Sequence, residues 1–204
     1  MITLQFLLTA FVVVLAPGTG VVYTLATGLG RGRRAALAAA LGCTFGIVPA
    51  LLAAALGLAA VLHASALLFT TIKIAGVAYL LWMAWGALRQ TGALAVRADR
   101  GRGSLFRVAW RGTLLNVLNP KLSIFFLALL PPFLSGAPEW AALEMGTLGG
   151  VFMAMTFVVF AVYGLFAGTF RNRVLGSARA MAWLNRSFAA IFAALAGRLA
   201  MERA

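Results

Sequence analysis

Apolar residues run through this chain in segments long enough to cross a bilayer, and short polar stretches separate them. Hydrophobic residues make up 63% of the 204 residues, whereas only 10% are charged. A water-soluble domain of this size could not bury so much apolar surface. One helical span needs about 20 apolar residues. The sequence therefore predicts an all-α integral membrane protein, with one membrane domain over residues 1–204.

Six such segments are predicted, three on each side of a polar linker. They cover residues 2–27, 35–62, 66–88, 106–134, 140–170 and 180–199. Residues 89–105 form the linker, so that 1–88 and 106–204 are the two halves. Because each half has three spans, the second half enters the membrane from the opposite face, as in the inverted repeats of secondary transporters. The last span has the weakest apolar pattern, since Asn185 and Arg186 interrupt it.

Basic residues give the chain a formal net charge of +13, and their positions favour a membrane orientation over nucleic-acid binding. They gather in the first, third and fifth connections: Arg31, Arg33 and Arg34; Arg89, Arg97, Arg100, Arg102, Arg107 and Arg111; Arg171, Arg173, Arg179 and Arg186. Short connections rich in Lys and Arg stay in the cytoplasm. The second connection holds only His63, and we place Glu139 and Glu144 in the fourth. Both termini are therefore expected outside, and no nucleic-acid partner is expected.

Proline interrupts two of the predicted spans at matching depths. Pro17 and Pro120 each lie about fifteen residues into their span, roughly 20 Å from its entry end at about 1.5 Å per residue. Proline removes a backbone hydrogen bond and frees a carbonyl. In lipid, such a group is tolerated only beside protein or a water-filled cavity. A pair of interrupted spans, one in each half, points to the binding site of a transporter, so we predict a site where the two breaks meet.

Residues beside the two breaks are the candidate substrate ligands. This predicted set is Pro17, Gly18, Thr19, Gly20, Tyr23, Asn116, Asn119, Pro120 and Lys121. The glycines allow close approach of the backbone to a ligand, and Asn119 and Lys121 could bind a carboxylate. An ammonium group within a span is costly and by default suggests a functional site. The alternative for Lys121 is that its side chain snorkels toward the headgroups.

Lys73 in the third predicted span is a candidate for ion coupling, with snorkelling to the outer surface as an equal alternative. No acidic residue is predicted in the middle of a span, so a carboxylate proton relay has no candidate. The sequence has no carboxylate cluster for a metal and no motif for ATP binding or hydrolysis. We therefore predict neither a metal nor another cofactor, and no catalytic residues.

Several short motifs, in order along nearly the whole chain, resemble the LysE/RhtB-type amino-acid exporters. They lie at residues 16–20, 30–34, 42–46 and 73–80 in the first half and at 119–121, 125–126 and 130–133 in the second. The resemblance implies a six-helix exporter in the bacterial inner membrane, driven by an ion or proton gradient. It further implies an amino acid or amino-acid derivative as substrate, the lipid bilayer as surroundings and a homodimer as an oligomeric state.

Three positions depart from the pattern of these exporters. Thr19 stands where the family usually has a second proline, and Pro132 where it often has glutamine. Many members carry an acid near the glycine pair of the second span, whereas Gly46 is followed here by Ile47, Val48 and Pro49. This missing acid places proton coupling there in doubt. The scarcity of acids within the spans favours a neutral substrate. A membrane scaffold or assembly subunit that transports nothing is the alternative function, and an intramembrane enzyme is the least favoured.

Overall fold

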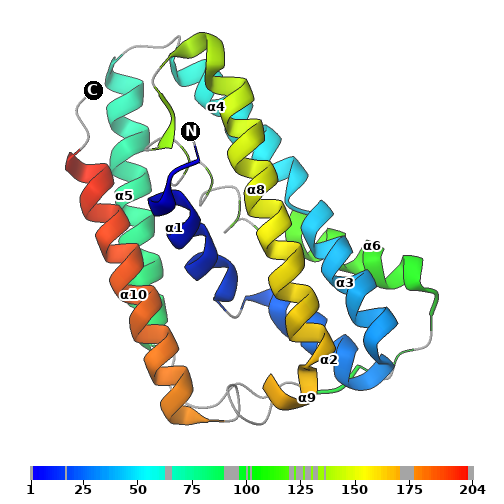
Figure 1. The fold of residues 1–204 in the computed structure, drawn as a ribbon. Coiled ribbons are helices and arrows are strands. Elements are labelled where there is room, and N and C mark those ends of the chain that lie inside the picture. Colours follow the sequence, from blue (N-terminus) through cyan, green and yellow to red (C-terminus); the bar gives the residue numbers. More distant parts are fainter. Residues whose placement is uncertain are drawn as a thin grey trace.

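The computed structural model describes residues 2–16, 18–62, 66–89, 97–99, 101, 103–119, 122, 126, 130, 133–135, 137–170 and 177–201. Within these residues the chain forms helices and no β-strand. The helices are α1 (Leu4–Leu15), α2 (Thr19–Arg31), α3 (Arg33–Phe45), α4 (Val48–Leu62), α5 (Ala66–Arg89), α6 (Leu105–Val117), α8 (Pro138–Leu165), α9 (Ala167–Phe170) and α10 (Ala178–Met201). An all-helical protein is therefore what the sequence folds into (Figure 1).

The first predicted span is two helices, α1 and α2, which meet at an angle of 56°. Thr3 begins α1, because its hydroxyl oxygen accepts a hydrogen bond from the backbone N–H of Phe6 at 3.1 Å. The helix ends at Leu15, and Ala16 is extended, with ψ of 123°. A residue before proline is excluded from the helical region by the proline ring. The bend thus follows from the position of Pro17, although Pro17 itself lies outside the described residues.

The second predicted span is also irregular, although it has no proline at the point of change. α3 ends at Phe45, and α4 begins at Val48 after a turn at Gly46 and Ile47. The two helices are nearly continuous, and residues Arg33–Leu56 are long and apolar enough to cross a membrane. The third predicted span is the single helix α5.

The fourth predicted span, residues 106–134, differs most from the structure. α6 ends at Val117, and Leu118 closes it with a backbone hydrogen bond to Leu114 at 2.9 Å. Beyond this end the structure describes only some of the residues up to 135. Three of these described residues are buried: Phe126, Leu130 and Phe133. Backbone hydrogen bonds run from the N–H of Leu130 to the carbonyl of Phe126 at 3.1 Å and from the N–H of Phe133 to the carbonyl of Leu130 at 3.0 Å.

The last two predicted spans correspond to α8 with α9, and to α10. α8 begins two residues earlier than predicted, because Pro138 suits the first turn of a helix, where no backbone donor is needed. The placement of Glu139 and Glu144 in a connecting loop was therefore wrong. Both residues lie within α8, and the Glu144 side chain is only 3% exposed. This burial is a tertiary effect that local sequence does not show.

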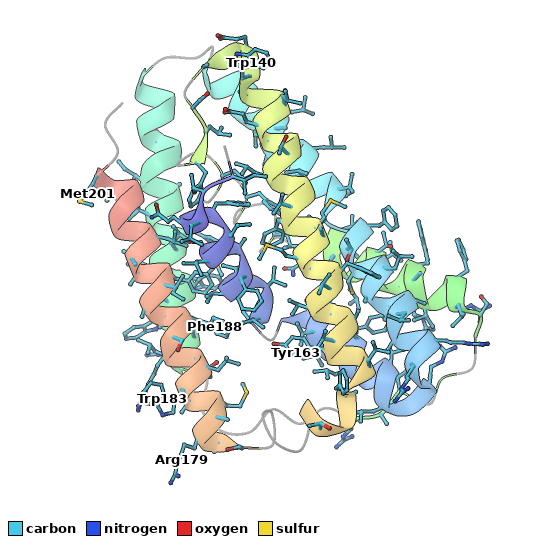
Figure 2. All side chains as sticks on the ribbon, in the orientation of Figure 1. Trp140, Tyr163, Arg179, Trp183, Phe188 and Met201 are labelled. Carbon is cyan, nitrogen blue, oxygen red and sulfur yellow. The ribbon has the colours of Figure 1, made fainter. Side chains whose placement is uncertain are left out.

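Among the described residues, length and composition identify three helices that could cross a membrane, or up to four when the bent pair α1–α2 counts as one span. Tryptophans mark the two ends of the bundle: Figure 2 shows Trp140 at one end and Trp183 with Arg179 at the other. Trp140 is 54% exposed and Trp183 is 68% exposed, as expected for anchors at the headgroup level. The chain is a multi-pass membrane protein, and the six-span layout stays a prediction.

Helix packing divides the described bundle into two groups. α5 and α10 lie side by side, and α2, α3, α6 and α8 pack together, with α1 between the groups (Figure 1). In the larger group the helices approach backbone to backbone. A Cβ atom built on Gly42 of α3 would overlap the carbonyl group of Ala109, and one on Gly28 of α2 would overlap that of Gly164. Small residues therefore set the distances between these helices.

Candidate functional site

A cavity of about 70 Å³ lies where the two interrupted spans approach each other. Its lining comes from α1, α2, α6 and α8, from the turn between α3 and α4, and from the chain beyond α6. The lining residues are Val13, Val14, Ala16, Gly18, Thr19, Gly20, Ile47, Asn116, Asn119, Leu122, Phe152, Thr156 and Phe160. Ala16 and Gly18 flank the first break, and Asn119 and Leu122 flank the second. The flanks of both breaks therefore meet around one cavity.

Most of the predicted substrate ligands lie at this cavity or next to it. Gly18, Thr19, Gly20, Asn116 and Asn119 line it. Tyr23 does not, and its hydroxyl donates to the carbonyl oxygen of Val108 at 2.8 Å in an adjoining groove. The remaining predicted ligands, Pro17, Pro120 and Lys121, lie outside the described residues. Lys73, the candidate for ion coupling, belongs to α5, and its side chain is likewise not described.

The carbonyl group of Leu15 at the end of α1 is satisfied by a side chain from another helix. In an unbroken helix it would accept from the backbone N–H of Thr19. Here it accepts a hydrogen bond from the hydroxyl of Tyr163 on α8, at 2.9 Å. Tyr163 is a residue that the sequence analysis missed, and it is labelled in Figure 2. The available signal was a tyrosine inside an apolar span, where its hydroxyl needs a partner.

A second backbone carbonyl is released at the turn between α3 and α4. Ile47 donates to Thr44 at 3.1 Å, so that the carbonyl oxygen of Cys43 does not receive the usual bond from four residues on. The side-chain amide of Asn116 donates to this oxygen at 2.6 Å. Asn116 is only 5% exposed and also lines the cavity. It therefore joins α6 to the irregular turn at the same point where it offers its amide oxygen to the cavity.

The N-terminus of α2 opens onto the cavity without a side-chain cap. Gly18 is the capping residue and makes no side-chain hydrogen bond, and the first bond within the helix runs from Val22 to Gly18 at 3.0 Å. The amide groups of Thr19, Gly20 and Val21 therefore have no acceptor within their own helix. A helix N-terminus also carries a partial positive charge. This arrangement suits an anionic group such as a carboxylate.

Gly20 keeps the cavity open. A Cβ atom at this position would lie 2.8 Å from the Phe160 ring and 3.3 Å from the amide oxygen of Asn116. Thr156, missed by the sequence analysis, lines the opposite wall and is 3% exposed. Its hydroxyl donates to the carbonyl of Phe152 at 2.8 Å, which leaves its oxygen as an acceptor.

An open groove of about 550 Å³ adjoins the cavity. Thr19 and Asn119 belong to both, and the other lining residues are Tyr23, Arg111, Leu114, Leu115 and Leu118. The groove therefore lies between α2 and α6, with one cation and a wall of leucines. Among the described lining residues of cavity and groove there is no acid, and the described part of the chain brings no three metal-binding side chains together.

A comparison with known protein families finds one family that matches almost the whole chain. Residues 11–203 match the family described as LysE type translocator. The chain belongs to this family. The resemblance inferred from the motifs is thereby confirmed.

Named relatives of this LysE-type chain include efflux proteins. It is 30% identical to the homoserine/homoserine lactone efflux protein of Salmonella typhimurium, over 97% of this chain and 95% of the relative. It is 26% identical to the leucine efflux protein of Enterobacter sp. (strain 638), over 94% and 91%. An uncharacterized membrane protein of Vibrio cholerae is 31% identical, over 98% and 97%. No solved structure shows a significant match to this chain. The family and these relatives support efflux of amino acids.

Proposed function

We propose that this LysE-type chain exports neutral amino acids, or neutral derivatives of them, by alternating access around the cavity at the two breaks. The observation that carries this proposal is the meeting of two helix ends at one cavity. Val13, Val14 and Ala16 bring the C-terminal end of α1 to the cavity, and Gly18, Thr19 and Gly20 bring the N-terminal end of α2.

The two helix ends have opposite polarity, as do the two charged groups of an amino acid. The N-terminus of α2 is electropositive and suits the carboxylate, whereas the C-terminus of α1 is electronegative and suits the ammonium group. The oxygen of Thr156 is a further acceptor for the ammonium group. Asn119, which lines the cavity, and Lys121 remain proposed partners of the carboxylate.

The lining favours a substrate whose side chain carries no charge. Six of the thirteen described lining residues are valine, isoleucine, leucine or phenylalanine, four carry a hydroxyl or amide group, and the other three are alanine and glycine. A cationic side chain would need an acid to balance its charge, and the described lining holds none. The names of the relatives, efflux proteins for homoserine, leucine and threonine, support the same class of substrate.

Helix pairing supports two related halves that rock around the site. The third helix of the first half, α5, pairs with α10, its counterpart in the second half. In the same way α2 packs on α8, and α6 packs on α3, so that each broken span contacts the middle helix of the other half. Such a reciprocal arrangement is expected of inverted repeats. We place the protein in the bacterial inner membrane.

Counterflow in proteoliposomes tests the proposal. Vesicles that contain the purified protein and an excess of unlabelled leucine, threonine or homoserine should accumulate the same amino acid in radiolabelled form from outside. Lysine and arginine in the same assay should give no accumulation. If vesicles with folded protein accumulated none of these amino acids, the result would favour the scaffold function instead.

A pair of glycine variants links transport to the cavity. Gly20→Ala should lower counterflow about tenfold, because its methyl group displaces Phe160 and Asn116 at a cost of about 1–3 kcal/mol. Gly150→Ala on α8 is the matched control, because nothing lies within 4 Å of its Cβ position. Equal counterflow rates for the two variants would contradict the assignment of the cavity as the substrate site.

A further inference from the structure

The groove beside the cavity has no part in the transport cycle proposed so far, although it leads directly to the substrate site. Thr19 of α2 and Asn119 beyond α6 line both the cavity and the groove of about 550 Å³. Tyr23 and Arg111 line the groove but not the cavity. Arg111 lies seven residues before Leu118, or about 10 Å along the axis of α6. The groove therefore has room for a small solute next to the cavity.

The two helices that form the groove run in opposite directions, and their basic ends lie together. The N-terminus of α2 and Asn116 near the C-terminus of α6 both lie at the cavity. At the other ends of these helices, the guanidinium of Arg31 donates to the carbonyl oxygen of Gly103, just before α6. Basic connections are predicted to face the cytoplasm. The groove thus runs from the predicted cytoplasmic side to the cavity.

Arg111 is the only charged side chain among the described residues that line the groove and the cavity. It is exposed, and a guanidinium offers a planar fork of donors that matches a carboxylate. Tyr23 adds an acceptor, because its hydroxyl hydrogen is donated to the carbonyl oxygen of Val108 and its own oxygen keeps a lone pair for an ammonium group. The charged groups of an amino acid therefore have partners in the groove.

The remaining wall of the groove suits an uncharged side chain. It consists of Leu114, Leu115 and Leu118, which follow one side of α6. A guanidinium beside an apolar wall could also attract the phosphate of an anionic lipid. The groove continues, however, into a cavity with the polar groups of Asn116 and Thr156, which an acyl chain cannot use. This continuity favours the transported solute over a lipid.

We propose that the groove is a cytoplasmic entry subsite, in which a neutral amino acid binds with its carboxylate on Arg111 before it moves into the cavity. The leucines contact its side chain, and the oxygen of Tyr23 accepts from its ammonium group. The carboxylate then passes from Arg111 to the electropositive N-terminus of α2, so that one positive group replaces another. This role rests on the proposed function, because it supplies the loading step of an exporter.

Protection of a thiol in the groove tests the subsite without measuring transport. The parent protein for this test carries Cys43→Ala, which removes the buried native thiol, and Leu115→Cys at a wall position that is 39% exposed. An uncharged, water-soluble maleimide is applied to this protein in phosphatidylcholine nanodiscs, which leave both faces accessible. Leucine should slow the labelling. Leucinol, which has a hydroxymethyl group in place of the carboxylate, should need an about tenfold higher concentration for the same effect.

Substitutions on α6 identify the group that binds the carboxylate. Arg111→Gln should raise the leucine concentration for half-protection about tenfold, because a charge-assisted hydrogen bond is lost, and Arg111→Lys should retain most of the protection. Arg107→Gln is the matched control, since Arg107 is an exposed arginine one turn earlier that is not among the described lining residues, and its value should equal that of the parent. Leucine and leucinol are compared in the parent itself, so that this comparison holds even where Arg111→Gln does not fold.

Several outcomes would overturn the entry subsite. Equal protection by leucine and leucinol, or an unchanged half-protection concentration in Arg111→Gln, would remove the carboxylate from Arg111. Labelling that leucine does not affect but that added phosphatidylglycerol slows would assign Arg111 to an anionic lipid. A parent thiol that does not react would place Leu115 against lipid chains. Counterflow without protection would leave the proposed function standing, whereas protection without counterflow would leave the subsite and overturn transport.

Discussion

Individual side chains in this LysE-type chain donate hydrogen bonds to backbone carbonyl groups where its helices are interrupted. Tyr163 donates to the carbonyl of Leu15 beside the first break, and Asn116 donates to the carbonyl of Cys43 at the turn after α3. Both donors come from a helix other than the interrupted one. Unpaired carbonyl groups in a bilayer cost several kcal/mol. These two residues therefore allow irregular backbone to exist at the depth where the cavity lies.

Removal of the Tyr163 hydroxyl should destabilise the protein through this effect. We expect Tyr163→Phe to lower the free energy of unfolding by about 1–3 kcal/mol, because the buried Leu15 carbonyl loses its donor. Thermal unfolding of the purified protein in detergent measures the change. Tyr79→Phe is the control, since Tyr79 on α5 stacks near Trp82 at 5.6 Å and should tolerate the loss of its hydroxyl. An equal effect of the two substitutions would show that the bond to Leu15 contributes nothing.

Whole helices are positioned by glycines, which decide how closely α2, α3, α6 and α8 approach. Gly42 leaves room for the carbonyl group of Ala109, and Gly46 leaves room for that of Thr113. Thr113 in turn donates its hydroxyl to the carbonyl oxygen of Gly42 at 3.0 Å. The close contact of α3 with α6 therefore depends on small residues at these two positions. Gly168 makes no such close helix contact, because nothing lies within 4 Å of its Cβ position.

A methyl group on α3 at this contact should force α3 and α6 apart. Gly42→Ala is expected to cost more than about 2 kcal/mol of stability, because backbone rather than a mobile side chain stands in the way. Gly86→Ala on α5 meets open space and should change stability by less than about 0.5 kcal/mol. The yield of monodisperse protein and its unfolding temperature compare the two. A well-folded Gly42→Ala variant would mean that the helices separate at little cost.

The sequence predicts some interruptions of the helices better than others. The bend between α1 and α2 was predictable because proline acts on its own neighbours. The turn at Gly46 and Ile47 was not, since it depends on the bond from Asn116, a residue far along the chain. For the same reason the burial of Glu144 and the roles of Tyr163 and Thr156 were missed. Each of them is defined by a partner or a cavity that only the packed bundle creates.

At the scale of the whole molecule, charge and tryptophan predict which end faces the cytoplasm. Arg179 and Trp183 lie at one end of the bundle, and Trp140 lies at the other (Figure 2). Basic connections favour the cytoplasmic side, so we predict that the Arg179 end faces the cytoplasm. Ser104, near the end of the basic linker, and Ser135, five residues before Trp140, are then expected on opposite sides.

Accessibility in whole cells checks this orientation. In a Cys43→Ala background, Ser135→Cys should react with a membrane-impermeant maleimide on intact cells. Ser104→Cys should react only after the cells are permeabilised. Both serines are exposed, so that the membrane rather than burial decides the outcome. The reverse pattern would invert the predicted topology.

The close contact of α2 with α8 at Gly28 and Gly164 has a consequence for the cell that makes this protein. Backbone packed on backbone leaves no room for water between these two helices at that point. A carrier built in this way can stand idle in the membrane without acting as a leak. The cell can therefore keep the protein in its membrane without a steady leak along this contact.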